Sequence, residues 1–468
     1  MQLSVLECMM LKELLKPDIQ DLIAIRNWTA LREVLSSWSA PEIADLLLDL
    51  DPGDRVLLFK SLDRDLSSEL FSYMETDDQD ALLEVLTNHE TRELLSALSP
   101  DDRTTLLEEL PAEMTQRLLS LLSPEDLKEA RFLLGYPEQS IGRLMTVDFL
   151  SVRAEWSVSE GLSYIRTHGK KSESINRIYI TDSRGCLQDD IPLRSFIFAD
   201  PDVKISTLMD GSVVSLSAFE DQEAAVQVME KYDISELPVI DSAGVLIGIV
   251  TFDDVMDIQE EEATEDFQKF GGMEALEKPY DATALISMVK KRAGWLILLF
   301  LGEMLTATAL AYFEQELDKA VILSLFLPLI ISSGGNSGSQ AATLIVRALS
   351  INEIGLKDWW FVLQREFLSG LLLGFILGFI GFFRIMLWSM ATGIYGDHAI
   401  QIGLTIGTSL IGVVMWGTLS GSMLPLLMKK LGFDPATSSA PFVATLVDVT
   451  GIVIYFSAAL WFLRGTLL

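Results

Sequence analysis

The chain has 468 residues, with 67 acidic and 35 basic side chains, so its formal net charge is −32 at pH 7. The excess lies in one part, because residues 1–292 carry 57 acidic and 27 basic side chains, whereas residues 293–468 carry 10 and 8. This acidity argues against nucleic acid as a partner and suits a cation-rich one, although an acidic surface also serves solubility.

The cysteines and the N-terminal stretch indicate the compartment. Cys8 and Cys186 occur without a CxxC pair, so we predict no disulfide framework and a reducing compartment. The stretch MQLSVLECMMLKELLKPD has no basic leader followed by a long apolar core. We therefore expect no signal peptide and a cytosolic location for the acidic part.

The pattern of residues 1–139 predicts helices throughout. Apolar side chains recur at helical spacing, as at Ile43, Leu46 and Leu47. Short breaks such as Ser99-Pro100-Asp101-Asp102 supply a helix N-cap, a proline for the first turn and acids at the positive end of the helix dipole. We predict an all-α superhelical N domain, or solenoid, that acts as a scaffold or contact surface.

Residues 140–260 contain an internal repeat. Leu144-Met145-Thr146 matches Leu208-Met209-Asp210, 64 residues later, and the strand and turn at 179–185 match those at 238–244. Two β-α-β-β-α units of this kind should pack together, because neither can bury its apolar face alone. The arrangement resembles a tandem CBS pair, an α/β module that senses nucleotides or ions.

The resemblance to CBS modules implies at most one nucleotide site. The second copy ends with Thr251 and Asp253 in a Thr-x-Asp pattern, which in these modules can hold the ribose and phosphate of a nucleotide such as ATP. The aligned stretch of the first copy, 187–194, has neither the glycine nor this pattern. An empty, purely structural CBS pair is an equal alternative.

A dense run of acids follows the repeat. Such a run is usually a solvated helix face. Eight acids in the fourteen residues 253–266 would repel one another, however, unless cations such as hydrated Mg²⁺ or Ca²⁺ sit among them. The acids that we predict as metal ligands are Asp253, Asp254, Asp257, Glu261, Glu262, Glu265 and Asp266. We expect residues 261–292 to form a connecting helix, with a helical part at 280–292 that leads to the membrane.

Residues 293–468 contain five apolar segments long enough to cross a bilayer. We expect them near 295–313, 320–349, 367–390, 400–428 and 436–463. Basic residues in the loops number eight on one side and two, Lys319 and Arg464, on the other. This bias predicts a multi-pass protein of the inner or plasma membrane, with its N-terminus in the cytoplasm and its C-terminus outside.

The second apolar segment has a polar centre, SSGGNSGSQ at 332–340. Pro328 and the three glycines favour irregular backbone, which at bilayer depth occurs only beside protein or water. Asn336 and Gln340, four residues apart, would share a helical face. We predict that the segment lines a water-filled path; a glycine-rich helix contact is the weaker alternative. In the third segment, where Gly370, Gly374 and Gly378 lie in apolar sequence, packing is the better explanation.

The last segment carries an acid, Asp448, within apolar sequence. An intramembrane carboxylate is costly and is a functional candidate by default. Ala440, Ala444 and Gly451 would share its helical face and leave room for a hydrated ion, whereas a hydrogen-bonded structural acid is the alternative. We include the neighbouring Thr445 among the ion-binding candidates. Glu303 in the first segment has a weaker case and is not predicted as a ligand.

The stretches GGNSGSQAATLIVRAL and PFVATLVDVTGIVIYF closely resemble the MgtE family of magnesium channels. The resemblance covers the whole chain and implies an α-solenoid N domain, a CBS pair, a connecting "plug" helix and a five-span pore domain at 293–468. It also implies a homodimer with the pore at the subunit interface. Asp448 matches the family's pore carboxylate and Ala444 the small residue one turn away. Some members have Asn where this chain has Ala440, which can contribute a backbone carbonyl.

We therefore expect a Mg²⁺-selective channel or transporter that mediates uptake and is gated by cytosolic Mg²⁺ bound to the N and CBS domains. The alternatives are a CBS-regulated carrier for Co²⁺ or Mn²⁺ and a membrane-anchored nucleotide sensor. Few carboxylates plus retained waters suit Mg²⁺, and the predicted spans contain no Cys or His for copper or zinc. No enzyme motif is found, so we expect a protein that is not an enzyme.

Overall fold

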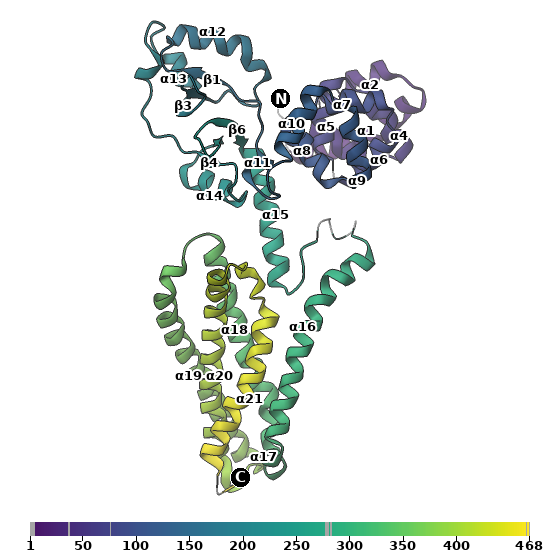
Figure 1. The fold of residues 1–468 in the computed structure, drawn as a ribbon. Coiled ribbons are helices and arrows are strands. Elements are labelled where there is room, and N and C mark those ends of the chain that lie inside the picture. Colours follow the sequence, from purple (N-terminus) through teal and green to yellow (C-terminus); the bar gives the residue numbers. More distant parts are fainter. Residues whose placement is uncertain are drawn as a thin grey trace. The chain divides into compact units, whose positions relative to one another are not determined.

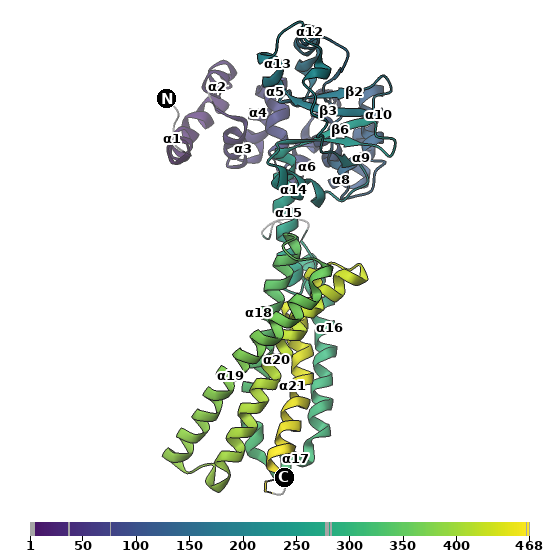
Figure 2. The same cartoon turned by 90° about the vertical axis from the view of Figure 1, so that its left-hand side faces the viewer.

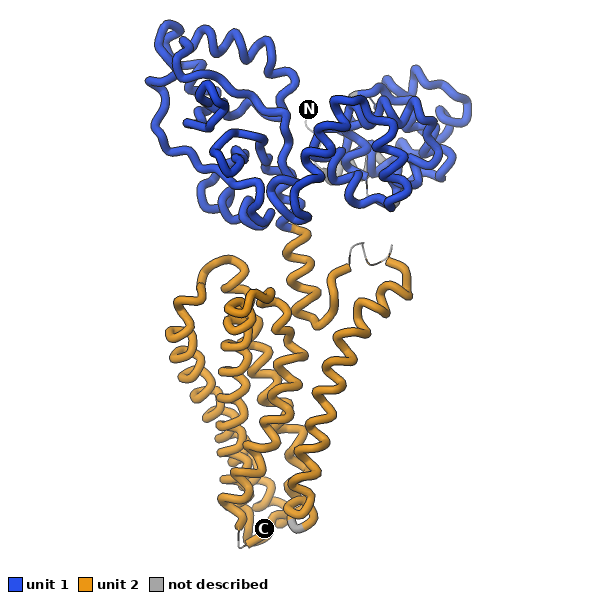
Figure 3. The backbone as a smooth tube through the Cα atoms, in the orientation of Figure 1, with its two compact units in different colours: residues 1–259 blue, residues 260–468 orange. Residues whose placement is uncertain are grey.

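The structure, a computed structural model, describes residues 5–35, 38–74, 76–276, 280, 283–464 and 466–467. It divides into two compact units, residues 1–259 and 260–468, which are described separately below (Figure 1, Figure 3). The predicted boundary between the CBS pair and the connecting segment lies within one residue of this division. Cys8 is placed in a helix, but its side chain lies outside the described set.

The first unit begins with the predicted helical domain. Its helices are α1 Val5–Ala24, α2 Trp28–Leu35, α3 Ala40–Leu48, α4 Pro52–Ser61, α5 Arg64–Ser72, α6 Thr76–Val85, α7 Asn88–Leu95, α8 Pro100–Glu109, α9 Ala112–Leu121 and α10 Pro124–Leu133. One continuous core of mainly leucine and isoleucine side chains runs through them, including Ile43, Leu46 and Leu47. The helical spacing of these residues thus directs their apolar side chains into one shared hydrophobic core.

The predicted breaks start helices as expected. The Ser99 hydroxyl accepts a hydrogen bond from the Asp102 amide at 3.3 Å, and the Ser123 hydroxyl accepts one from the Asp126 amide at 3.1 Å. Each serine is followed by a proline in the first helical turn. Capping therefore satisfies amides that lack an intrahelical partner and fixes the residue at which each of these helices begins.

The repeat forms two similar three-stranded sheets. The first copy contains α11 Ile141–Leu144, β1 Ser151–Arg153, α12 Val158–His168, β2 Arg177–Thr181, β3 Leu187–Pro192 and α13 Leu193–Phe198. The second contains β4 Leu216–Ser217, α14 Glu223–Tyr232, β5 Glu236–Ile240 and β6 Leu246–Thr251. Short 3₁₀ turns occupy Gly169–Lys171 and Ile205–Thr207. The strand orders are β1-β2-β3 and β4-β5-β6, each with one parallel and one antiparallel pair.

The two copies meet through their equivalent hairpin turns. The Leu187 amide donates to the Gly244 carbonyl and the Leu246 amide to the Gly185 carbonyl, both at 3.0 Å. Gly185 and Gly244 have φ angles of +85° and +78°, which only glycine adopts readily. The matching sequences at 179–185 and 238–244 therefore form a symmetric contact, as expected for a CBS pair.

The second unit contains the membrane helices. After α15 Phe252–Phe270, which crosses the division between the units, come α16 Leu285–Tyr312, α17 Glu314–Lys319, α18 Leu327–Ser350, α19 Trp359–Thr392, α20 Ala399–Leu431 and α21 Ala440–Leu463. Short 3₁₀ turns occupy Val321–Phe326, Leu356–Asp358, Gly396–His398 and Pro435–Thr437. Five segments in the described part of the chain are long and apolar enough to span a bilayer, as predicted.

Two local expectations are wrong. The second span is not irregular, because α18 is a continuous helix with Pro328 in its first turn, where the missing amide costs no hydrogen bond. The segment 261–292 is not one helix either: α15 ends at Phe270, and residues 285–292 are the first turns of α16. The predicted helical part at 280–292 falls partly on residues 281–282, which lie outside the described set together with 277–279.

Glycines bring the membrane helices into close contact. Gly370, Gly374 and Gly378 of α19 are buried against α20, which confirms the packing explanation. Figure 2 shows the two helices. In α18 the packing explanation also holds for two glycines: the Gly334 and Gly338 carbonyls lie against Gly417 and Gly421 of α20. The glycines of the polar segment therefore bring α18 against α20 and do not loosen its backbone.

We expect Gly421→Ala to destabilise the membrane unit. The added Cβ would overlap the backbone carbonyl oxygen of Gly338, which has no flexible side chain to move aside. Overpacking of this kind costs about 1–3 kcal/mol and occasionally more, which should lower the melting temperature of the detergent-purified protein. Gly355→Ala is the control, since its Cβ would meet only the Asp358 side chain at 3.8 Å. Equal melting temperatures for the two variants would contradict this packing account.

Candidate functional site

Three polar side chains of α18 lie on a different face from its packing glycines. Gly334, Ser337 and Gly338 are buried, and the Ser337 hydroxyl shares a 2.7 Å hydrogen bond with Thr418 of α20. Ser332, Asn336 and Gln340 are exposed, with the Asn336 amide donating to the Ser332 hydroxyl at 3.4 Å. Asn336 and Gln340 therefore do share a face, and it points out of the helix bundle of a single chain.

Asp448 of α21 lies beside this helix. Its side chain is half-buried, and a Cβ built on Gly335 would stand 3.9 Å from Asp448 Oδ1 and 3.5 Å from Ala444 Cβ. The small residue one turn before Asp448 and the glycine opposite thus leave space next to the carboxylate. Gly451, predicted on the same face, is instead buried against Val413 of α20.

The start of α21 is fixed by hydrogen bonds to two other helices. The Ser339 hydroxyl of α18 donates to the Ala440 carbonyl at 3.4 Å, and the Trp295 indole of α16 donates to the Ser439 hydroxyl at 3.1 Å. The Ala440 carbonyl is thus already an acceptor. Thr445 donates to the Pro441 carbonyl at 3.0 Å and turns its methyl group toward Gly302 of α16, so it faces a helix contact.

The predicted acidic ligands all lie on α15, but the two ends of this helix have different surroundings. Asp253 and Asp254 begin the helix in the first unit, and Glu265 and Asp266 lie near its end in the second. Asp257, Glu261 and Glu262 lie between them. Among the described residues, no group of three or more His, Cys, Asp or Glu side chains is arranged to hold a metal directly.

Five carboxylates from three segments gather in the first unit. Asp101 and Asp102 of α8, together with Asp253 of α15, act electrostatically on Asp254 of α15. The same three residues act on Glu173 of the first CBS copy. Asp101 is only 7 % exposed, and its Oδ1 has no hydrogen-bond partner within the part of the chain that the structure describes. We call these five residues the interdomain acid cluster, because they come from the helical domain, the CBS pair and α15.

The surroundings of the interdomain acid cluster favour its neutral forms. Burial, reinforced by the charge of Asp102, raises the pKa of Asp101 to about 6. Partial desolvation, followed by the charges of Asp101 and Asp253, raises the pKa of Glu173 to about 7. Burial and the charge of Asp101 also raise the pKa of Asp254 well above its ordinary value. Neighbouring carboxylates repel one another when all of them are ionised. A cation bound among them would offset this repulsion and stabilise their ionised forms.

The C-terminal end of α15 is bound to the membrane unit. The Lys269 ammonium forms ion pairs with Glu265 and, at 2.9 Å, with Asp434 in the loop before α21. A Cβ built on Gly272 would meet the Trp295 indole at 2.7 Å and Pro441 at 3.3 Å. The chain that leaves α15 therefore packs directly on the first turn of the helix that carries Asp448.

The comparisons with known proteins agree with this organisation. Residues 327–458 match the family model MgtE, described as a divalent cation transporter, and residues 38–139 match the MgtE intracellular N domain. Residues 202–261 match the CBS domain. The chain is 38 % identical to the magnesium transporter MgtE of Thermus thermophilus over 331 residues, which cover 71 % of this chain and 72 % of the relative. The chain belongs to the MgtE family.

Other relatives support this assignment. The magnesium transporters MgtE of Enterococcus faecalis and Bacillus subtilis are 34 % and 31 % identical, with 72 % of this chain covered in each case and 72 % and 73 % of the relatives. A crystal structure of the cytosolic domain of the Mg²⁺ channel MgtE in complex with ATP has 34 % identity and a TM-score of 0.50, and covers 52 % of this chain and 99 % of that one. The soluble part of a magnesium transporter has 28 % identity and a TM-score of 0.51, covering 54 % and 99 %.

The CBS pair of this MgtE chain differs between its copies. In the second copy, the Thr251 hydroxyl donates to Asp254 Oδ2 at 2.6 Å, and Asp253 is exposed. In the first copy, the buried Asp189 accepts hydrogen bonds from the Asp210 and Gly211 amides at 2.9 and 3.0 Å, a structural role. Of the Thr-x-Asp pair in the second copy, Asp253 is thus the residue whose side chain is exposed.

Three of the five residues of the interdomain acid cluster could not be predicted from the sequence. Asp101 and Asp102 are predicted only as acids at the start of a helix, a position that they also occupy, and Glu173 lies in no recognisable motif. Their approach to α15 is a long-range contact that no local pattern encodes. The one available signal was the large excess of acid over base in residues 1–292.

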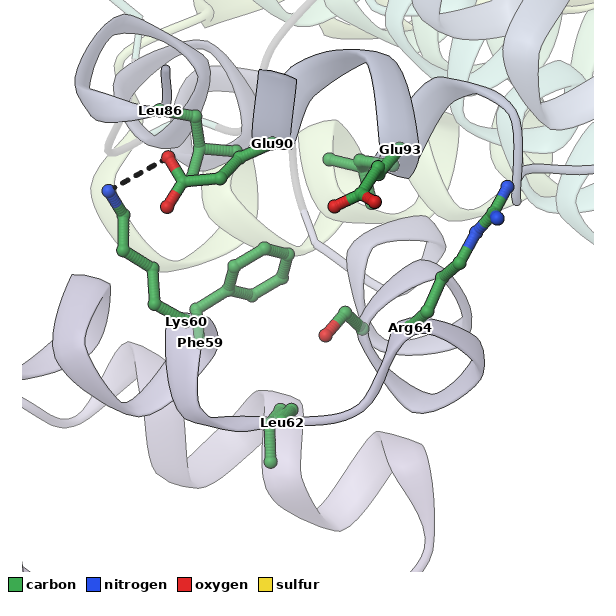
Figure 4. Close-up of a pocket in the computed structure, with 9 residues that line it drawn as sticks. Phe59, Lys60, Leu62, Arg64, Leu86, Glu90 and Glu93 are labelled. Carbon is green, nitrogen blue, oxygen red and sulfur yellow. Dashed lines mark hydrogen bonds and ion pairs between the residues drawn. The ribbon is translucent and has the colours of Figure 1, made fainter. Parts of the chain in front are cut away.

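A hollow in the helical domain of this MgtE chain does not resemble a cation site. It is lined by Phe59, Lys60, Leu62, Arg64, Ser67, Leu86, Glu90, Glu93 and Leu94 (Figure 4). Its acidic side chains face basic ones: Lys60 pairs with Glu90 at 3.0 Å, and Figure 4 shows Arg64 on the side of Glu93. Because these charges offset one another, the hollow lacks the uncompensated carboxylates of the interdomain acid cluster.

Proposed function

We propose that this chain is a Mg²⁺-selective channel or transporter that mediates magnesium uptake and is gated by cytosolic Mg²⁺. The observation that carries the proposal is the half-buried Asp448 beside Gly335 and Ala444, in a chain of the MgtE family. A carboxylate in a membrane helix needs water, a cation or a polar partner. The polar face of α18 supplies the hydroxyl and amide groups that a water-filled path requires.

The site suits a cation that keeps its water. Mg²⁺ gives up its hydration shell reluctantly and is often bound by one or two carboxylates plus waters. Asp448 supplies the charge. The small residues Ala444 and Gly335 leave room beside it for a hydrated ion. Asn336 and Gln340 are exposed and can hydrogen-bond the outer waters. The Ala440 carbonyl, already bonded by Ser339, is a weaker candidate.

We propose a homodimer with the path at the subunit interface. The polar stripe of Ser332, Asn336 and Gln340 is exposed on a single chain, and facing lipid it would be costly. A two-fold partner would cover the stripe and bring a second Asp448 to the same axis. The charge bias of the loops supports a cytoplasmic N-terminus and an external C-terminus in the cytoplasmic membrane.

Gating is proposed to act through α15. Mg²⁺ bound with its waters at the interdomain acid cluster would offset the repulsion of its carboxylates and hold the helical domain on the CBS pair. The same helix ends in the ion pair between Lys269 and Asp434, beside the first turn of α21. We infer that α15, a helix of 19 residues, transmits the change at the acids to the loop before α21. Cytosolic Mg²⁺ would thus favour the closed state, because it binds that state more tightly.

ATP is proposed as a second ligand, at the end of the second CBS copy. Asp253 is exposed and can accept hydrogen bonds from ribose hydroxyls. Thr251 would have to give up its 2.6 Å bond to Asp254 to contact a nucleotide. Because Asp253 and Asp254 also belong to the interdomain acid cluster, ATP and Mg²⁺ would act on the same end of α15.

Ion flux into liposomes that contain only this protein tests the proposal. We expect saturable Mg²⁺ uptake that persists without Na⁺ and exceeds uptake of Mn²⁺ and Co²⁺. Preferred transport of Co²⁺ or Mn²⁺ would support a carrier for another divalent ion. Absence of flux for every divalent ion, in a protein that still binds nucleotide, would favour the membrane-anchored sensor and overturn the proposal.

A further inference from the structure

The first membrane helix carries an acid that the ion path described above does not use. Glu303 is the only charged residue between Arg292 and Glu314. It lies well inside α16, its side chain is exposed, and no hydrogen bond or ion pair joins it to another described residue. A lone carboxylate facing lipid at this depth would be costly, so its surroundings in the membrane should be polar.

Helix α16 runs beside α21, and contacts at three heights fix their register (Figure 1, Figure 2). The Trp295 indole bonds Ser439 near the start of α21, and a Cβ on Gly302 would stand 2.9 Å from the Thr445 methyl. Further along, the rings of Phe313 and Phe456 stack with their centres 4.6 Å apart. The contacts advance together along both helices, so α16 and α21 are parallel.

This register places Glu303 and Asp448 at nearly the same depth. Glu303 follows Gly302 by one residue and Asp448 follows Thr445 by three, so their heights differ by about 3 Å at the helical rise per residue. Glu303 is also the charged group that acts electrostatically on Asp448. The two carboxylates therefore belong to one local environment, although they come from the first and last spans.

The position of Asp448 around α21 agrees with this. Ala444 and Val447 face Gly335 and Gly334 of α18, whereas Thr445 faces Gly302 of α16. At 100° per residue, Asp448 falls between these two directions. Its carboxylate thus points to the seam between α18 and α16, with the polar stripe on one side and Glu303 on the other.

A second polar group of α16 lies close to Glu303. Thr306 follows it by three residues, so the two side chains are neighbours on the helix surface. The Thr306 hydroxyl oxygen is buried and has no hydrogen-bond partner among the described residues. An unsatisfied hydroxyl next to an unpaired carboxylate in an apolar helix points to water or an ion at this seam.

We propose that Glu303 is a second carboxylate of the ion path and sets the affinity with which hydrated Mg²⁺ is drawn to Asp448. This inference rests on the proposed transport function and deepens it. Glu303 would act through the waters of the ion and by its charge, with Asp448 as the principal ligand. A divalent cation gains from each additional nearby carboxylate about twice what a monovalent cation gains, so the pair also favours Mg²⁺ over Na⁺ or K⁺.

The test is concentration-dependent Mg²⁺ uptake into liposomes by Glu303→Gln, which keeps the shape of the side chain and removes its charge. We expect KM for Mg²⁺ to rise about tenfold, as for loss of one charge about 6 Å from a divalent ion in water, while the maximal rate changes little. Monovalent cations should compete more strongly, and Glu303→Asp should restore most of the affinity.

Glu366→Gln is the matched control. Glu366 is half-buried near the start of α19, and α19 packs against α20, away from Asp448. We expect wild-type KM for this variant. An unchanged KM in Glu303→Gln, or an equal rise in both variants, would overturn the role of Glu303. If Asp448→Asn also retained normal transport, the proposed path itself would fail, so the two failures are distinguishable.

Discussion

Asp448→Asn should abolish Mg²⁺ uptake while leaving the fold intact. The substitution keeps the size of a half-buried side chain beside Gly335 and Ala444 and removes its charge. A carboxylate about 5 Å from a divalent ion contributes between about 2 kcal/mol in water and about 7 kcal/mol at an effective dielectric constant of 20. A loss near the middle of this range lowers ion occupancy by more than 100-fold. Uptake of Mg²⁺ into liposomes measures the effect.

The control for this variant is Asp397→Asn. Asp397 lies in the exposed 3₁₀ turn before α20, so its replacement removes the same charge from the same unit without touching the path. We expect wild-type uptake from it. Elution volume and melting temperature in detergent check that both variants are folded. Normal uptake by Asp448→Asn would remove Asp448 from the ion path and, with it, the main argument for the pore.

Local patterns in the sequence were sufficient where the physics is local. Ser99 and Ser123 start helices at the predicted residues because capping depends on only a few neighbouring amides. The five spans follow from hydropathy and length, since the bilayer imposes both on each helix separately. The matching turns at Gly185 and Gly244 follow from the repeat, because equal sequences require equal left-handed backbone.

Tertiary contacts decided the rest. The glycines of 334–338 are compatible either with irregular backbone or with close helix packing. Only the positions of Gly417 and Gly421 on α20 show that packing is the explanation. Nothing in the segment that contains Glu303 distinguishes it from a structural acid. Its importance lies in the register of α16 on α21, which the sequence of one helix does not contain.

The double variant Asp101→Asn, Asp254→Asn should uncouple the cytosolic domains from Mg²⁺. In the wild type, the interdomain acid cluster repels itself, as the raised pKa values of Asp101 and Asp254 show, with burial as the largest cause and neighbouring carboxylates as the next. In the proposed mechanism, Mg²⁺ offsets this repulsion and orders the unit. In the variant, the two asparagine amides cause little repulsion and bind the cation weakly. The order of residues 1–259 should therefore no longer depend on Mg²⁺.

Limited proteolysis of the full-length protein measures this coupling. For the wild type, we expect cleavage within residues 1–259 to slow several-fold as Mg²⁺ rises through the millimolar range. For the double variant, we expect one cleavage rate at all Mg²⁺ concentrations, and Mg²⁺ uptake in liposomes that is no longer inhibited by Mg²⁺ on the cytosolic side. Because Asp448 is unchanged, uptake itself should persist.

The matched control replaces two exposed acids of the same unit, Glu113→Gln and Glu230→Gln, which lie on α9 and α14 outside the interdomain acid cluster. It loses the same net charge, so any general effect of acidity on Mg²⁺ binding would appear here too. We expect it to keep the Mg²⁺-dependent protection of the wild type. If the control lost protection equally, or if the Asp101 and Asp254 variant kept it, bulk charge and not these five carboxylates would control the response to Mg²⁺.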